Sequence, residues 1–179
     1  MRQLLRSWFG LTPGPVRTAQ EFYGRVVAAA RQPAFYRDWG IPDTVEGRYE
    51  MVALHLFLAL EALKARPDEA ARLSQPVIEA FVTDMDDCMR EMGVGDTVVP
   101  KKVKRAAAAF YERSGAYRAG LADGAAPAAL AAALTRHAYG VAGASTAPAH
   151  AEMLAGYMRK AYTRLRGQDA ASMFQQASN

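Results

Sequence analysis

Three aspartates within four residues, Asp84, Asp86 and Asp87, are the first side chains that could do chemistry. Helical aspartate-rich motifs hold Mg²⁺ for diphosphate chemistry in all-helical prenyl-transfer enzymes. Such sites need a second aspartate-rich helix, because Mg²⁺ requires several oxygen ligands in a nearly octahedral array. This sequence has no second aspartate cluster, and the chain is short for that fold. We therefore interpret the aspartates as a solvated acidic helix face and keep a Mg²⁺-dependent enzyme as the less favoured alternative.

Other residues that could act as nucleophiles or metal ligands are no better placed. Cys88 falls in the middle of an apolar helix face, which is typical of an inert core thiol. His55 stands in an apolar run without a His-Glu-x-x-His spacing, so we expect a buried histidine with a satisfied hydrogen bond. The sequence also lacks G-x-S-x-G, P-loop and G-x-G-x-x-G motifs. We predict no catalytic residues, no metal site and no cofactor.

The composition indicates one helical domain. A chain of 179 residues that is 51% hydrophobic can enclose a sizeable core. Alanine-rich segments favour helices, and no alternating pattern with hairpin signals predicts strands. The single cysteine excludes an internal disulfide framework and fits a reducing compartment. No secretory signal is visible, and no run approaches the roughly 18 apolar residues of a membrane span.

The first helix is expected to begin at Thr18, where Glu21 completes a Thr-x-x-Glu capping box. Pro33 is expected to stop it. An aromatic loop over residues 33–44 follows and contains Trp39. Exposed loop aromatics can bind partners, although such residues more often pack onto the edge of a core.

The next helix is the predicted centre of the fold. Asp43 or Thr44 caps it, and it covers residues 45 to about 65. The helix is apolar on nearly every side, which indicates burial all round. Further helices are expected over residues 127–139 and 148–165. The prediction is an all-α, single-domain bundle of about six to seven helices around this central apolar helix.

The domain limits follow from the same pattern. Residues 1–17, which carry three arginines and no acids, are expected to form an N-terminal arm, either a solvated terminus or a transit-like interfacial helix. Residues 18–167 form the helical domain. Residues 168–179 are expected to be a mobile tail.

The clearest amphipathic pattern covers residues 75–92, with Ser74 as the expected N-cap and Pro76 in the first turn. Its apolar residues fill one arc of about 140°, and we expect this arc to be mainly core. The arc consists of Val77, Ile78, Phe81, Val82, Met85, Cys88, Met89 and Met92.

Charged residues occur on both sides of the turn predicted at Gly93. Asp84, Asp87 and Glu91 share one side of the acidic helix, and Arg90 points away from the apolar arc. After Pro100, the next helix opens with Lys101, Lys102, Lys104 and Arg105. Cations at a helix N-terminus are unfavourable because they oppose the helix macrodipole. Their placement suggests an anionic partner such as RNA or lipid headgroups, although the neighbouring acidic helix could itself be that partner. A single basic patch with few nearby aromatics does not indicate sequence-specific nucleic-acid binding.

The sequence over roughly residues 34–140 resembles the ubiquinol–cytochrome c chaperone family. The most specific block runs from Asp84 to Lys104. Val103 and His137 depart from the expected Met and Asn. The matching features are Leu54-His55-Leu56, Phe81, Asp84-Met85-Asp86-Asp87, Met89-Arg90-Glu91-x-Gly93-Val94-Gly95-Asp96, Val99-x-Lys101-Lys102-x-Lys104, Phe110-Tyr111-x-Arg113, Tyr117 and the run ending at Arg136.

The resemblance implies a bacterial, non-enzymatic assembly factor for respiratory complex III. It implies newly made cytochrome b as partner, contact with the ribosome, and a location in the cytoplasm or at the periphery of the inner membrane. A peripheral membrane or general protein-interaction module is the main alternative. We expect client contact at the edge of the 77–92 helix with the Trp39 loop, and ribosome or lipid contact at the basic patch. The candidate partner-binding residues are Trp39, Asp84, Asp87, Arg90, Glu91, Lys101, Lys102, Lys104 and Arg105.

Overall fold

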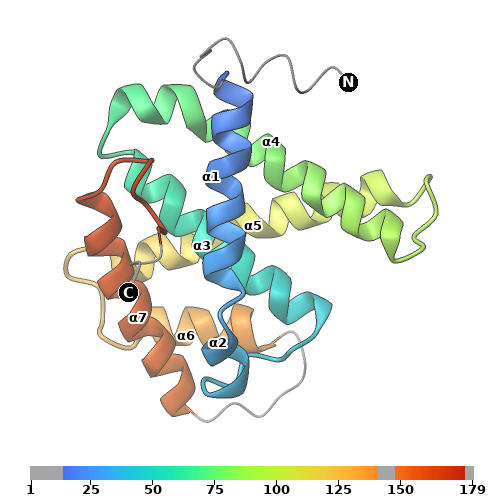
Figure 1. Cartoon of the computed structure of the whole chain (residues 1–179). Helices are drawn as coiled ribbons and strands as arrows, with labels where there is room; N and C mark the ends of the chain where they lie inside the picture. The colour runs from blue at the N-terminus through green and yellow to red at the C-terminus, as the bar shows by residue number, and fades with distance from the viewer. Residues whose placement is uncertain (1–13, 141–147, 176–179) are drawn as a thin grey trace.

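The structure is a computed structural model and describes residues 14–140 and 148–175. These residues form helices and turns with no strand among them, which confirms the predicted all-α class. Figure 1 shows the helices packed around a central one. The elements are α1 (Pro15–Ala30), α2 (Pro33–Arg37), α3 (Val45–Leu63), α4 (Pro67–Glu91), α5 (Val99–Leu121), α6 (Ala129–Leu134), the π-helical turn η1 (Thr135–Tyr139) and α7 (Pro148–Arg166).

Helix α3 is the centre of the fold, as predicted. The Thr44 side chain accepts a hydrogen bond from the Gly47 amide at 3.1 Å, which caps the helix. Every residue from 50 to 59 is buried, and α3 packs against α1, α4, α5, η1 and α7. His55 is buried, with its Nδ1 2.8 Å from the Met51 carbonyl and its Nε2 2.7 Å from the Tyr157 hydroxyl. The predicted satisfied core histidine is therefore confirmed.

Helix α1 begins earlier than expected. Its N-cap is Gly14, and Pro15 occupies the first position, where a missing amide hydrogen costs nothing. Glu21 pairs with Arg17 at 2.9 Å instead of capping the helix, so the predicted capping box is wrong. The expected limit between residues 17 and 18 falls inside α1, and residues 1–13 of the predicted arm lie outside the described residues.

The residues predicted as an aromatic loop begin with the short helix α2, which Pro33 starts. Phe35 is buried, and its ring lies 5.1 Å from that of Trp39. Trp39 also contacts Tyr157 of α7, with ring centroids 5.6 Å apart. Trp39 therefore packs onto the edge of the core, which is the more common outcome for such residues.

Helix α4 is one continuous helix, which corrects the predicted start at Ser74. Pro76 lies inside it and removes one backbone hydrogen bond. Leu73, Val77 and Phe81 are buried on both sides of that position. Their common burial against the core holds the helix together across the proline, which local sequence rules do not take into account.

The predicted mobile tail is packed over the residues that the structure describes. Arg25 of α1 donates to the carbonyl oxygens of Ala170 and Met173 at 2.8 and 3.2 Å. Glu69 of α4 accepts a hydrogen bond from the Ala170 amide at 3.0 Å. Met173 is fully buried. Residues 168–175 therefore pack against the folded unit, because the Met173 side chain is part of the hydrophobic core.

Candidate functional site

A two-helix arm projects from the bundle and carries eight of the nine predicted partner-binding residues. We define the arm as residues 82–105, which comprise the end of α4, the connecting turn and the start of α5. Figure 1 shows these two helices extending beyond the other helices on the right of the view. Gly93 has φ +77°, which permits the sharp turn at the end of α4. The Val94 amide donates to the Met89 carbonyl at 3.0 Å and closes that turn.

The apolar arc of α4 is core only at the base of the arm. Val77 and Phe81 are buried, whereas the later members of the arc are only partly buried and Met92 is 52% exposed. Val98, in the turn, is 43% exposed. Our prediction that the whole arc is mainly core is therefore wrong for its second half. Towards its end the arm extends beyond the other helices of the described residues (Figure 1), so fewer neighbouring elements cover its apolar face there.

Aromatic packing fixes the point where the arm leaves the bundle. The Phe81 ring lies 5.6 Å from that of Phe110 and 6.2 Å from that of Tyr49, which joins α4, α5 and α3. The Tyr49 hydroxyl donates to the Ala106 carbonyl at 2.7 Å. Just beyond this cluster, Val82 and Met85 still pack against the core of the bundle.

The predicted acidic residues of α4 have different environments. Asp84 accepts a 2.8 Å hydrogen bond from the Tyr23 hydroxyl of α1. Arg90 binds Asp86 at 2.5 Å and also pairs with Asp96 in the turn. Across the described chain, Asp87 and Glu91 have no ion pair and are exposed. The three aspartates that suggested a metal site therefore do not converge, because Asp84 and Asp86 contact different protein partners.

The four cations at the start of α5 are exposed. Within residues 14–140 and 148–175, none of them forms an ion pair or a side-chain hydrogen bond. The neighbouring acidic helix does not neutralise them, which leaves their charges directed to solvent. These residues are Lys101, Lys102, Lys104 and Arg105.

Trp39 is separate from the arm. It follows α2, and its ring contacts are with Phe35 and Tyr157. Its carbonyl oxygen accepts a hydrogen bond from the Tyr139 hydroxyl at 2.9 Å. The structure therefore does not bring Trp39 together with the charged residues of α4 and α5.

Buried charges hold α5 against α3, and the sequence reasoning did not anticipate them. Arg113 donates two hydrogen bonds of 2.6 Å to the Glu50 carboxylate, whose side chain is only 1% exposed. Burial raises the pKa of Glu50, while Arg113 opposes that shift. The only available signal was a glutamate at the start of an apolar run.

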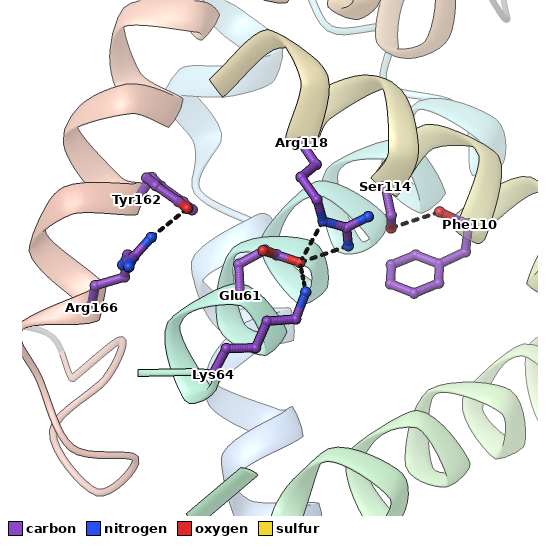
Figure 2. Close-up of polar contacts among 7 residues, drawn as sticks. All are labelled: Glu61, Lys64, Phe110, Ser114, Arg118, Tyr162 and Arg166. Atoms are coloured by element: carbon purple, nitrogen blue, oxygen red, sulfur yellow. Dashed lines mark hydrogen bonds and ion pairs between the residues drawn. The ribbon is translucent and has the colours of Figure 1, made fainter. Parts of the chain in front are cut away.

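A second charged cluster lies further along the same two helices. Figure 2 shows Arg118 and Lys64 directed at the Glu61 carboxylate, with the Ser114 hydroxyl donating to the Phe110 carbonyl nearby. The Glu61 oxygen lies 2.7 Å from Arg118 and 2.5 Å from Lys64. Both clusters are structural, because each joins α3 to α5.

The residues that the structure describes contain no candidate metal centre and no candidate membrane span. No group of three or more His, Cys, Asp or Glu side chains there has a geometry that could hold a metal ion. No helix in the described ranges is long and apolar enough to cross a membrane.

Burial is the main cause that raises the pKa of the Cys88 thiol, and the carboxylates of Asp84 and Glu91 add to it. That thiol is therefore a poor nucleophile.

Comparisons with known proteins agree with the resemblance seen in the sequence. The model of the family described as "Ubiquinol-cytochrome C chaperone" matches residues 37–178. A solved structure described as "Crystal structure of the Cbp3 homolog from Brucella abortus" has a TM-score of 0.74 to this chain. The two are 40% identical, over 88% of this chain and 84% of the other. No curated protein sequence matches the chain.

Proposed function

The chain belongs to the ubiquinol–cytochrome c chaperone family, and from that premise we propose that it is a non-enzymatic chaperone for the assembly of respiratory complex III. Its proposed client is newly made or newly inserted cytochrome b. Its proposed location is the cytoplasm, with contact at the periphery of the inner membrane. The family supports a chaperone role, and the client and the location are our proposals.

The observation that carries the client proposal is the partly exposed apolar face of the arm. Met85, Met89 and Met92 lie along this face, and Met92 and Val98 are the most exposed of its large apolar residues. Methionine side chains are flexible and polarizable, so they adapt to client helices of different shape. A helix of a membrane protein is apolar on every side, and it would cover the seam that the two arm helices leave open.

The charged borders of the arm suggest a second set of contacts. The four unpaired cations of α5 suit an anionic surface, and we propose that they contact the ribosome through charge alone. Asp87 and Glu91 are also unpaired and exposed on α4, and they are proposed to contact basic residues that flank a membrane helix. Arg90 is proposed to hold the turn in place through Asp86 and Asp96. Trp39 is proposed only as the margin of the client surface.

Photocrosslinking tests the client surface. A photoreactive residue at Met89 or Met92 is expected to capture cytochrome b in cells that are synthesising it. The control places the same photoreactive amino acid at position Glu152 of α7 or Ala119 of α5, which are both exposed. Crosslinks from the control positions alone would refute the arm as the client surface.

Charge reversal tests the ribosome contact. Replacing Lys101, Lys102, Lys104 and Arg105 with Glu is expected to abolish co-sedimentation with ribosomes, because the phosphate contacts become repulsive. Co-sedimentation that is unchanged by all four substitutions would exclude this contact. A peripheral membrane module is the alternative, and flotation with anionic vesicles that depends on these four residues would favour it.

A further inference from the structure

A separate surface depression of about 630 Å³ lies at the corner where α1, α2 and α3 meet. It is outside the arm and uses none of the predicted partner-binding residues. The depression is within the size range of small-molecule sites, roughly 300–1,000 Å³. Its lining residues are Arg31, Pro33, Tyr36, Arg37, Asp43 and Arg48.

Three arginines from three elements line this depression. Arg31 ends α1, Arg37 lies in the last turn of α2, and Arg48 lies in the first turns of α3. Pro33 starts α2 two residues after Arg31, so a short and rigid connection keeps these arginines on one side of the corner. We call this set the arginine corner.

The arginines of the corner are only partly neutralised. Arg37 binds Asp38, the residue next to it, and Arg48 binds Asp43, each at 2.7 Å. Arg31 has no ion pair or side-chain hydrogen bond within the described residues. Three arginines against two carboxylates leave one positive charge (3 − 2 = 1). Exposed ion pairs of this kind contribute little free energy, so an anionic ligand can displace them.

Tyr36 provides a fixed polar group beside these cations. Its hydroxyl donates to the Ala30 carbonyl at 3.0 Å, which ties the α2 ring to the end of α1. Burial raises the pKa of Tyr36, and the positive charges of Arg48 and Arg31 oppose that shift. Both guanidinium groups are therefore close enough to act on the same hydroxyl. Because that hydroxyl already donates its single hydrogen to Ala30, its oxygen can only accept further hydrogen bonds, and the arginines supply the donors of the corner.

We propose that the arginine corner binds a phosphate group, carried either by a small phosphorylated molecule or by the headgroup of an anionic lipid. A phosphate presents several oxygens in a tetrahedral array, and planar guanidinium groups bind such oxygens in pairs. Three guanidinium groups from separate elements match that array better than they match one planar carboxylate. The corner shares no lining residue with the arm.

The test uses the full chain with two kinds of probe. Binding of inorganic phosphate and pyrophosphate is measured by calorimetry, and binding to vesicles of phosphatidylglycerol or of phosphatidylcholine is measured by flotation. The variant is Arg31→Gln with Arg48→Gln. The matched control is Arg72→Gln with Lys160→Gln, which removes two exposed and unpaired charges of α4 and α7 that lie outside both the corner and the arm.

The corner variant is expected to weaken binding by about tenfold or more, because charge-assisted hydrogen bonds are lost, while the control binds normally. Loss of phosphate or pyrophosphate binding identifies a small phosphorylated ligand. Loss of flotation with phosphatidylglycerol alone identifies a lipid headgroup.

Absence of binding to every probe, or an equal loss in the control, would overturn the proposal. Arg31→Gln alone removes no ion pair of the fold and serves as the test if the double variant does not fold. Cytochrome b crosslinking from Met92 is expected to be unchanged in the corner variant, so the two proposals can fail separately.

Discussion

The hydroxyl of Tyr23 on α1 donates a 2.8 Å hydrogen bond to the carboxylate of Asp84 on α4. This contact joins the base of the arm to the first helix of the bundle. Burial is the main cause that raises the pKa of Tyr23, and the bond to Asp84 adds to it. Asp84 is one of the residues that the sequence suggested for partner binding, and the structure gives it a partner within the fold.

Replacing Tyr23 with Phe is expected to lower the free energy of unfolding by about 1–2 kcal/mol, because Asp84 loses its partner in a half-buried position. Urea denaturation measures the change. Tyr111→Phe is the control, because Tyr111 is 60% exposed and its loss is expected to cost less than about 0.5 kcal/mol. Equal stability of the two variants would show that the Tyr23–Asp84 bond contributes nothing.

Replacing Arg113 with Met is expected to destabilise the protein by about 3–5 kcal/mol, because Glu50 keeps a buried charge without a partner. The double variant Glu50→Met with Arg113→Met is expected to be more stable than Arg113→Met alone, since no buried charge is left. The measurement is a double-mutant cycle. It compares urea denaturation of the unaltered protein, the two single variants and the double variant. A cost below about 1 kcal/mol for Arg113→Met would contradict the prediction.

His55 is expected to make stability depend on pH. Burial lowers its pKa from 6.5 to about 4, so between these values the unfolded chain binds a proton that the folded protein does not bind. Stability should therefore fall by about 1.4 kcal/mol for each pH unit as the pH drops from 6.5 towards 4, and this term should be constant above 6.5. The His55→Gln variant should lack this slope. Urea denaturation of the protein and of the His55→Gln variant at pH 7 and pH 5 measures how much stability each loses on acidification. Equal losses in the two would show that His55 is not the cause.

Two glycines of α5 are expected to respond in opposite directions to alanine. A Cβ at Gly120 would lie 2.8 Å from the Leu130 Cα, so Gly120→Ala should force α5 and α6 apart and cost about 1–3 kcal/mol. A Cβ at Gly115 would meet nothing within 4 Å. Gly115→Ala should therefore stabilise the helix by about 0.5–1 kcal/mol. Thermal melts of the two variants provide the measurement, and shifts of the same sign would count against the close helix contact.

Met173 tests whether the C-terminal segment is part of the fold. Met173→Ala is expected to cost about 2 kcal/mol or more, because the side chain is fully buried. Met153→Ala is the matched control, since Met153 is 47% exposed on α7 and its truncation should have little effect. Similar melting temperatures for both variants would support the mobile tail that the sequence suggested.

Several elements could be predicted because local rules agree with the tertiary structure at those positions. Helix α3 is apolar on nearly every side, so the chain had to enclose it, and Thr44 supplies a cap that depends only on neighbouring residues. Gly93 and Pro100 mark the turn between α4 and α5 for the same local reason. The family could also be identified from the block between Asp84 and Lys104.

Other features could not be predicted because they depend on residues far apart in the sequence. Local rules predict that α4 starts at Ser74, yet the burial of Leu73 and Phe81 holds a longer helix together across Pro76. The segment after residue 167 has no periodic pattern, which predicts a mobile tail. Its packing depends on Arg25, which is 145 residues away from Ala170.

The helical class, the central helix, the charged residues on each side of Gly93 and the family all follow from the order of the amino acids. Which part of the α4 apolar arc is buried and which part is open follows only from the packing of the helices, since burial depends on whether another helix covers that face. That packing also separates Asp84, which binds Tyr23, from Asp87 and Glu91, which are unpaired. A helical pattern shows which residues share a face, and the packing of distant elements decides whether that face is core or a binding surface.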